Sequence, residues 1–541
     1  MQVSRPKLLD PPHPVAYQLL ILSRIRRVKC DEQQPSCGKC TVSGRVCDGY
    51  GIWGQPSIAQ KAIAQQQTFF PTYPPQSFPG LAQQEKRYLD QFRSLVVDKL
   101  AQPFGSYFWS SIVTQLSMTE PAVVHASIAL ASAYESSLPS KDRTALAGSF
   151  TLRQYNQAIL ALTSDISFED RASLRTAVVS CVLFICLEIL RGDLKAMQAH
   201  FSSGVKLLCQ LQHGQHRNPM MDRILVKHNA EVLDDHLVDV FTKLNLHFLM
   251  LGHGSQLKQT FVPSFMYDRR IQVPRHFSSS REARQTLNII LCAVIHLVKE
   301  AEELTLTTNL HPPPPTGSAL EEQRALQQAL SEWTAAYDLS VGELCATELA
   351  HESLRLTMLR IYADMFTQFL TTSFSIKETA YDAHTAVFES IIKRYAEVLS
   401  VQEAAVHDSR VNSNRFFTID MGFFPPLYCT ALKCRNPKIR RDALSLLRRF
   451  RHMEGPWTGA MLARVAEYVV RLEEEHFEGA QHSTSAVVLP EFCRIHCVEC
   501  KLPNQHGQGS NIGSLTLRRF RHELGKAGNW SVTKCDIDLT L

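Results

Sequence analysis

Four cysteines near the start of the chain have spacings that suit metal binding. Within residues 24–50 they form the pattern C-x6-C-x2-C-x6-C, at Cys30, Cys37, Cys40 and Cys47. Thiolates at such short spacings can hold a zinc ion, because the loops between them can close around a tetrahedral centre. The sequence therefore predicts a small zinc module in which the metal takes the place of a hydrophobic core.

Four basic side chains lie directly before the first of these cysteines, at Arg24, Arg26, Arg27 and Lys29. A basic segment beside a metal-held module can meet both the phosphates and the base edges of DNA. Residues 1–50 hold eight Lys and Arg against four Asp and Glu, which is most of the net charge of +5. The two clusters together therefore predict binding to double-stranded DNA.

This stretch resembles the fungal zinc binuclear-cluster domain of transcription factors. The run RIRRVKCDEQQPSCGKCTVSGRVCDGY is similar to the last three quarters of that domain, whose six cysteines hold two zinc ions. The resemblance implies that the four cysteines match the third to the sixth of the family, and that Pro35 lies in the connecting loop. It also implies that Arg26 and Arg27 reach base edges in the major groove, while Arg24 and Lys29 contact phosphates.

The sequence departs from the family pattern where the first two cysteines should stand, because it has Leu20 and Ser23 there. Four thiols can hold at most one zinc ion of the pair found in the intact cluster. We hypothesise a wrongly assigned exon boundary just before Arg24, with the missing cysteine pair encoded upstream. The alternative is a helical regulatory cofactor that has lost DNA binding. The zinc stoichiometry of residues 1–60 would separate these two possibilities.

The remaining chain divides by composition. Residues 1–23 are expected to be a disordered or wrongly assigned leader, and the Gln- and Pro-rich stretch 51–83 a flexible linker. From there apolar residues recur at helical spacing, which predicts a large all-helical domain of roughly a dozen or more helices over 84–500. A weakly structured tail is expected over 501–541. The strongest helical patterns cover 85–100, 120–137, 171–190, 195–211, 230–251, 281–304, 344–370 and 380–399.

Two segments of this helical part also resemble the family, whose members often carry a large helical regulatory domain after the linker. FGSYFWSSIVTQLSMTEPAVVHASIALASAYE is similar to the opening of that domain, and PLYCTALKCRNPKIRRDALSLLRRF is similar to part of its close. The expected fold class is therefore mostly α, with a small Cys-rich zinc module, a flexible linker and a helical domain.

Two further clusters are open to more than one interpretation. Cys493, Cys497 and Cys500 form C-x3-C-x2-C, a pattern that iron–sulfur enzymes use and that His496 could extend to a zinc site. Separate thiols on a strand or loop are favoured, because the chain upstream is helical. A second basic cluster could bind nucleic acid, but its spread over two helices with leucines between favours a solvated outer face. Its members are Lys433, Arg435, Lys438, Arg440, Arg441, Arg448, Arg449 and Arg451.

The sequence contains no motif typical of an enzyme and no apolar run long enough to span a membrane. It has no nucleophile elbow, phosphate-binding loop or H-E-x-x-H, and its longest uncharged apolar run, Thr176–Leu187, is too short. We therefore predict a zinc-dependent, sequence-specific transcription regulator of the RNA polymerase II type, without enzymatic activity and located in the nucleus. Its expected partners are DNA, a second copy or a heterodimer partner, and co-regulators, but no membrane.

Overall fold

The computed structural model describes the chain from residue 80 onward, with gaps. The described ranges are 80–101, 106–137, 145–165, 170–213, 224–226, 232–251, 261–263, 271–307, 314–347, 350–408, 417–475, 489–503, 511–521 and 529–539. The chain divides into two compact units, one formed by 1–78 with 230–236 and the other by the rest. The predicted leader, the zinc module at 24–50 and the linker up to residue 79 lie outside the described residues.

The amino-terminal helices of the second unit pack around one helix that is buried on nearly every side. This is α9 (Arg171–Arg191), which begins at Asp170, whose carboxylate accepts a hydrogen bond from the Ala172 backbone N–H. It ends at Gly192, whose positive φ of 74° is a conformation that glycine adopts readily. The helices of this group are α4 (Gln83–Gln91), α5 (Val97–Leu100), α6 (Thr114–Leu116), α7 (Pro121–Ser137), α8 (Ala145–Asp165), α9 and α10 (Leu194–His213).

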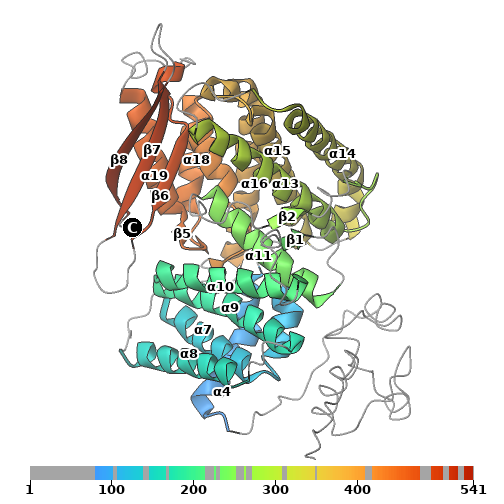
Figure 1. Ribbon diagram of the computed structural model, residues 1–541, viewed down its shortest axis with the longest axis vertical. Coiled ribbons are helices and arrows are strands. Elements are labelled where there is room, and N and C mark those ends of the chain that lie inside the picture. The colour runs from blue at the N-terminus through green and yellow to red at the C-terminus, as the bar shows by residue number, and fades with distance from the viewer. Residues whose placement is uncertain are drawn as a thin grey trace, which may run out of the picture. The chain divides into compact units, whose positions relative to one another are not determined.

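Within this group α9 packs between α7 and α10, and α8 covers the other side of α7 (Figure 1). Two short π-helical segments, Phe92–Val96 and Phe108–Val113, follow α4 and precede α6. Among the described helices, α9 alone is long and apolar enough to cross a membrane, yet 89% of its apolar window is buried inside the protein. Burial on this scale is that of a core helix.

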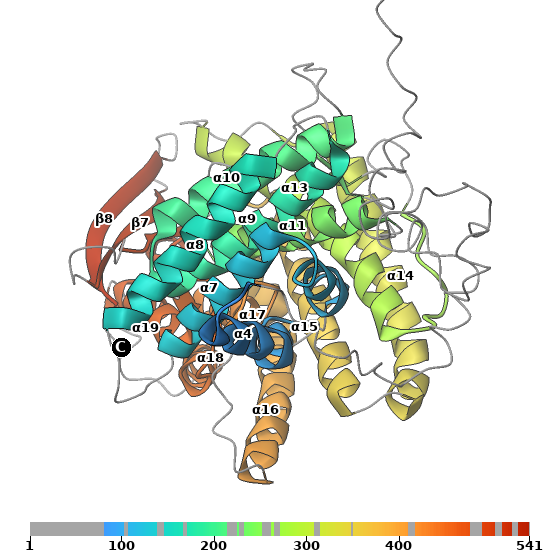
Figure 2. The same ribbon diagram turned by 90° about the horizontal axis from the view of Figure 1, so that it is seen from below.

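The longer helices of the second half share one hydrophobic core, in which Trp333, Tyr362 and Phe366 are almost fully buried. In this half α13, α14 and α15 pack on one another, and α17, α18 and α19 form a second packed group (Figure 2). The helices are α11 (Leu233–Met250), α13 (Ser280–Thr307), α14 (Gly317–Thr347), α15 (Ala350–Thr372), the 3-10 helix η5 (Glu378–His384), α16 (Thr385–Asp408), α17 (Phe424–Lys433), α18 (Pro437–Arg449) and α19 (Gly459–Glu475).

The described residues also form three small sheets. β1 (Ile224–Val226) pairs in parallel with β2 (Phe261–Pro263), and the two-residue strands β3 (Phe417–Thr418), β4 (Met453–Glu454) and β5 (Trp457–Thr458) form a second sheet. The third sheet is antiparallel with the order β6-β7-β8 and consists of β6 (Cys497–Lys501), β7 (Ile512–Arg521) and β8 (Asn529–Asp538). The 3-10 helix η6 (Glu491–Cys493) precedes β6.

The mostly α fold is confirmed, but two details of the predicted domain are wrong. The tail expected to be weakly structured over 501–541 contains β7 and β8, because Leu515, Leu517 and Ile537 bury one face of the hairpin in the main core. The helix expected over 344–370 is two helices, since α14 ends at Thr347 and α15 begins at Ala350.

Candidate functional site

The residues predicted to bind zinc and DNA all lie outside the described part of the chain, so their roles stay predictions. They are Cys30, Cys37, Cys40, Cys47, Arg24, Arg26, Arg27 and Lys29. As a donor set, four thiols suit one tetrahedral zinc ion and fall two short of a six-cysteine cluster. Within the described ranges, no group of three or more His, Cys, Asp or Glu side chains could hold a metal ion.

Two members of the second basic cluster, Arg435 and Arg440, are buried in ion pairs, and a third, Lys433, is partly buried in one, which contradicts the solvated face predicted for them. The Arg435 guanidinium donates to Glu378 at 2.7 Å and to Glu473 at 2.8 Å, and Arg440 donates to the other oxygen of Glu473 at 2.7 Å. Lys433 Nζ lies 2.7 Å from Glu378. The Arg435, Arg440 and Glu473 side chains are at most 2% exposed. These residues therefore stabilise the interior and are not available to a polyanion.

The carboxylate of Glu473 is held in its charged form by this arrangement. Burial alone would raise its pKa, but the attraction of Arg435 and Arg440 and their hydrogen bonds outweigh burial and lower the pKa to about 2. The Ile495 backbone N–H donates a further hydrogen bond to it at 2.7 Å. Glu473 is thus ionised at neutral pH and satisfies two buried guanidinium groups at once.

The ion pairs continue into a connected set of eight residues, which we call the ionic network. Arg494 donates to both carboxylate oxygens of Asp382 at 2.7 Å. Glu491 accepts from the backbone N–H groups of Glu378 and Thr379, at 2.8 and 2.9 Å. The members are Glu378, Asp382, Lys433, Arg435, Arg440, Glu473, Glu491 and Arg494.

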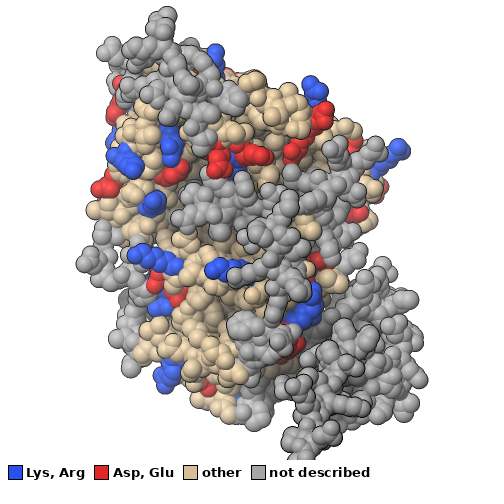
Figure 3. Space-filling view, viewed as in Figure 1, with Lys and Arg blue, Asp and Glu red and all other residues tan. Residues whose placement is uncertain are grey.

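The other members of the second basic cluster are exposed, and two of them face acidic residues of α19. Arg441 lies 3.6 Å from Glu474, and Arg448 pairs with Glu467. On the face shown in Figure 3 the described basic and acidic side chains are interspersed, without a continuous basic patch. This distribution does not favour a second nucleic-acid site on that face.

The second thiol cluster does not converge on one point. Cys497 and Cys500 are three residues apart on β6, so their side chains point to opposite faces of the sheet. Cys500 is buried in the main core, and Cys493 ends the short helix η6. His496 Nε2 lies 3.0 Å from Glu491. The arrangement is that of separate thiols, as the sequence favoured.

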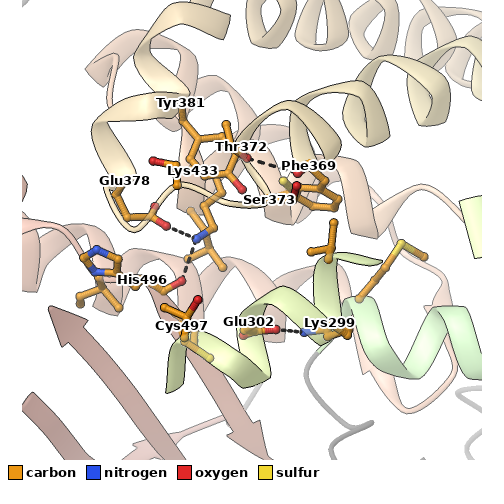
Figure 4. A pocket seen from close by; sticks show the side chains of 18 of the residues that line it. Lys299, Glu302, Phe369, Thr372, Ser373, Glu378, Tyr381, Lys433, His496 and Cys497 are labelled. Atoms are coloured by element: carbon orange, nitrogen blue, oxygen red, sulfur yellow. Dashed lines mark hydrogen bonds and ion pairs between the residues drawn. The ribbon is translucent and has the colours of Figure 1, made fainter. Parts of the chain in front are cut away.

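A cavity of about 270 Å³ lies between α13, α15, α17 and the sheet that contains β6 (Figure 4). Its walls are largely apolar, with Val298 from α13, Phe369 from α15 and Val498 from β6. Sequence reasoning missed this cavity, because its walls come from segments far apart in the chain, from Leu249 on α11 to Trp530 on β8, and no local motif marks them.

One side of the cavity is polar. Lys433 Nζ donates to the Glu378 carboxylate and to the His496 carbonyl oxygen, each at 2.7 Å, and lies 5.3 Å from the centre of the Tyr381 ring. Lys299 and Glu302 form a second pair at 2.6 Å (Figure 4). Burial would lower the pKa of Lys433, but the attraction of Glu378 outweighs it and raises that pKa. Lys433 is therefore an ammonium ion at neutral pH.

The thiol that faces this side is neutral. Burial, followed by the nearby charge of Glu302, raises the pKa of Cys497 to about 12. Burial also raises the pKa of the Tyr381 hydroxyl to about 12. Neither group is therefore an ionised nucleophile at neutral pH, and the mostly apolar walls with a few polar groups are typical of a small-molecule site.

Comparison with known proteins agrees with the sequence motifs. The fungal Zn(2)-Cys(6) binuclear cluster domain matches residues 24–52, and the fungal specific transcription factor domain matches residues 87–230. No solved structure matches the chain.

Two relatives are similar over different shares of the chain. The aspercryptin biosynthesis cluster-specific transcription regulator atnN of Emericella nidulans is 23% identical over 87% of this chain and 90% of its own length. The transcription regulator lscL of Purpureocillium lilacinum is 28% identical over 42% of this chain and 57% of its own length.

The cysteine spacing, the basic segment before it and the helical domain after it define a DNA-binding transcription regulator. Both relatives carry names of regulators rather than of enzymes. The chain carries a match to the fungal Zn(2)-Cys(6) binuclear cluster domain and one to the fungal specific transcription factor domain, and the cluster domain implies zinc binding. A cofactor without DNA binding, the alternative left open by Leu20 and Ser23, is not favoured by the cluster-domain match.

Proposed function

We propose that the chain reads DNA through a zinc-held module in which Arg26 and Arg27 contact guanines. Each guanidinium can donate two hydrogen bonds, to O6 and N7 of guanine in the major groove. Arg24 and Lys29 flank this pair and supply phosphate contacts, which position the module without adding sequence information. The observation that supports the proposal is the continuous run from these four basic residues into Cys30, within the matched domain.

The zinc ligands in this proposal are Cys30, Cys37, Cys40 and Cys47, which hold one ion on the chain as its sequence stands. The metal supplies the rigidity that a segment of this size cannot obtain from an apolar core. One module contacts few base pairs, so a second copy or a heterodimer partner completes the site. The helical domain then recruits co-regulators in the nucleus.

The printed name of the relative from Emericella nidulans adds a class of target to this proposal, since that protein is named for one biosynthesis cluster. We extend to this chain the control of a biosynthetic gene cluster. Transcript levels of such a cluster in a strain that lacks the chain would test the extension, and unchanged transcripts of every cluster would contradict it.

The base-reading roles can be tested on DNA selected by the full chain from random oligonucleotides. Replacing Arg26 and Arg27 by Ala should abolish the preference for the selected site, because each lost contact removes about 1–3 kcal/mol of discrimination. Affinity for random duplex at low salt should fall much less. The matched variant Arg24→Ala, Lys29→Ala should weaken both duplexes alike and reduce the salt dependence. If the variant Arg26→Ala, Arg27→Ala lost affinity equally for selected and random DNA, the base-reading roles would be refuted.

A further inference from the structure

We propose that the cavity beside Lys433 binds a small, uncharged, largely apolar molecule that presents a carbonyl oxygen to the Lys433 ammonium group. The inference concerns the helical domain alone and does not depend on how the amino-terminal module reads DNA. Three observations carry it: the size and walls of the cavity, the balance of charges around it, and one donor of Lys433.

The volume and the apolar walls of the cavity indicate the size and the polarity of the ligand. The cavity volume of about 270 Å³ is close to the lower end of the range for small-molecule sites, roughly 300 Å³. Met365 and Leu432 extend the apolar wall, and Trp530 on β8 also lines the cavity. The Trp530 indole N–H donates to the Thr305 carbonyl oxygen at 3.1 Å, so the polar group of this wall residue already has a partner. A single ring with a short substituent suits this space.

The charges around the cavity are already balanced, which excludes an ion as the preferred ligand. The ionic network contains four cations and four carboxylates, and Lys299 pairs with Glu302. Glu499, at another edge of the cavity, lies 3.6 Å from Arg518. An ionised ligand would lose its hydration without finding an unpaired opposite charge, and that loss opposes binding.

Lys433 offers the one directed hydrogen bond that we assign to the ligand. An ammonium group has three donors, and the bonds to Glu378 and to the His496 carbonyl use two of them. The third has no hydrogen-bond partner among the described residues, and the side chain ends at the cavity (Figure 4). A carbonyl oxygen can accept this bond without bringing a donor of its own that would need a partner.

The ionic network holds this donor in place. Glu378, which anchors Lys433, is itself anchored by Arg435, and Arg435 by Glu473. Glu473 also accepts from the backbone of Ile495, next to the His496 carbonyl that Lys433 contacts. The polar side of the cavity is therefore formed before any ligand arrives, which reduces the entropy lost on binding.

The test uses three probes of one ring size with the full chain: acetophenone, which carries a carbonyl, cumene, which carries no oxygen, and benzoate, which is charged. Dissociation constants come from ligand-observed NMR titrations. Acetophenone should bind, and cumene should bind about tenfold more weakly, since one hydrogen bond contributes on that order. Benzoate should bind more weakly than acetophenone. Absent binding of acetophenone, or binding of cumene or benzoate at least as tight, would overturn the proposal.

Two variants locate the binding. Val298→Phe fills the cavity and should abolish acetophenone binding, whereas Val387→Phe, at a partly buried position on α16 outside the cavity, should leave it unchanged. In the variant Lys433→Met the dissociation constants of acetophenone and cumene should lie within twofold of each other, because the donor that distinguishes the two probes is gone. If that variant does not fold, the Val298→Phe comparison still decides the matter, and unchanged binding there would place the probe elsewhere and refute the site.

Discussion

At the scale of single residues, the helical domain contains one buried carboxylate, Glu473, that two buried guanidinium groups share. Glu473 is 0% exposed and contacts both Arg435 and Arg440. Its neighbour Glu474 is 25% exposed and faces an exposed Arg441 at 3.6 Å. The same residue type thus has two very different surroundings at successive positions of α19, which gives a matched pair for measurement.

We expect Glu473→Gln to destabilise the protein by about 3–5 kcal/mol, because it leaves a buried guanidinium charge without its partner. Glu474→Gln should cost only about 0–1 kcal/mol, as exposed ion pairs do. Urea unfolding followed by circular dichroism would measure both values. If both variants lost less than about 1 kcal/mol of unfolding free energy, the buried guanidinium groups would not need the Glu473 carboxylate.

The same residues show where sequence reasoning fails. In the sequence, a run of Lys and Arg looks the same whether its side chains are exposed to solvent or form ion pairs inside the protein. The partners of Arg435 are Glu378, earlier in the chain, and Glu473, later, and nothing local links them. The run from Arg24 to Cys47 was informative for the opposite reason, since ligand spacing and the adjacent basic residues form one local pattern.

At the scale of elements, helical periodicity predicted most of the long helices but not their exact limits. Helix α7 covers Pro121–Ser137, close to the expected range 120–137, and it can begin at Pro121 because proline is tolerated in the first turn. The strands β7 and β8 were missed because their alternation is broken, since Arg519 lies on the same face as Leu515 and Leu517, and the exposed face carries the apolar Val532. Burial against distant helices, which makes this segment ordered, has no local signature.

The contact between α18 and α19 depends on a glycine. A Cβ atom at Gly459, where α19 begins, would clash with the backbone carbonyl oxygen of Leu447 in α18. Gly342 in α14 is exposed and has open space around the same position. Replacing each glycine by alanine therefore tests two effects separately: close packing at Gly459 and helix propensity alone at Gly342.

We expect Gly459→Ala to lower the free energy of unfolding by about 1–3 kcal/mol, as overpacking does, although Ala is the better helix former. Gly342→Ala should raise it by about 0.5–1 kcal/mol through helix propensity alone. Thermal unfolding of the two variants beside the wild type would show shifts of opposite sign. A higher melting temperature for both would mean that α18 and α19 tolerate separation.

At the scale of the whole molecule, metal dependence and helical folding should be separable. The proposed ligands lie within 24–50, whereas the described helices surround a core of their own and offer no metal site among the described residues. We therefore expect the helical part to keep its fold without zinc.

We expect a strong chelator to abolish DNA binding by the full chain while leaving its far-ultraviolet circular dichroism nearly unchanged. Fluorescence anisotropy of labelled duplex would measure the first, and excess zinc should restore it. Cys37→Ser with Cys40→Ser should behave like the chelated protein even when zinc is present. A loss of helical signal in parallel with DNA binding would contradict the separation.

The ionic network has a consequence for how the protein opens. Its members lie on η5, at the end of α17, on α18 and α19, and around η6. If any one of these segments unfolded locally, a charged side chain on another segment would stay buried without its ion-pair partner. These segments should accordingly open together as one cooperative block, with backbone amides that exchange with deuterium at a common slow rate.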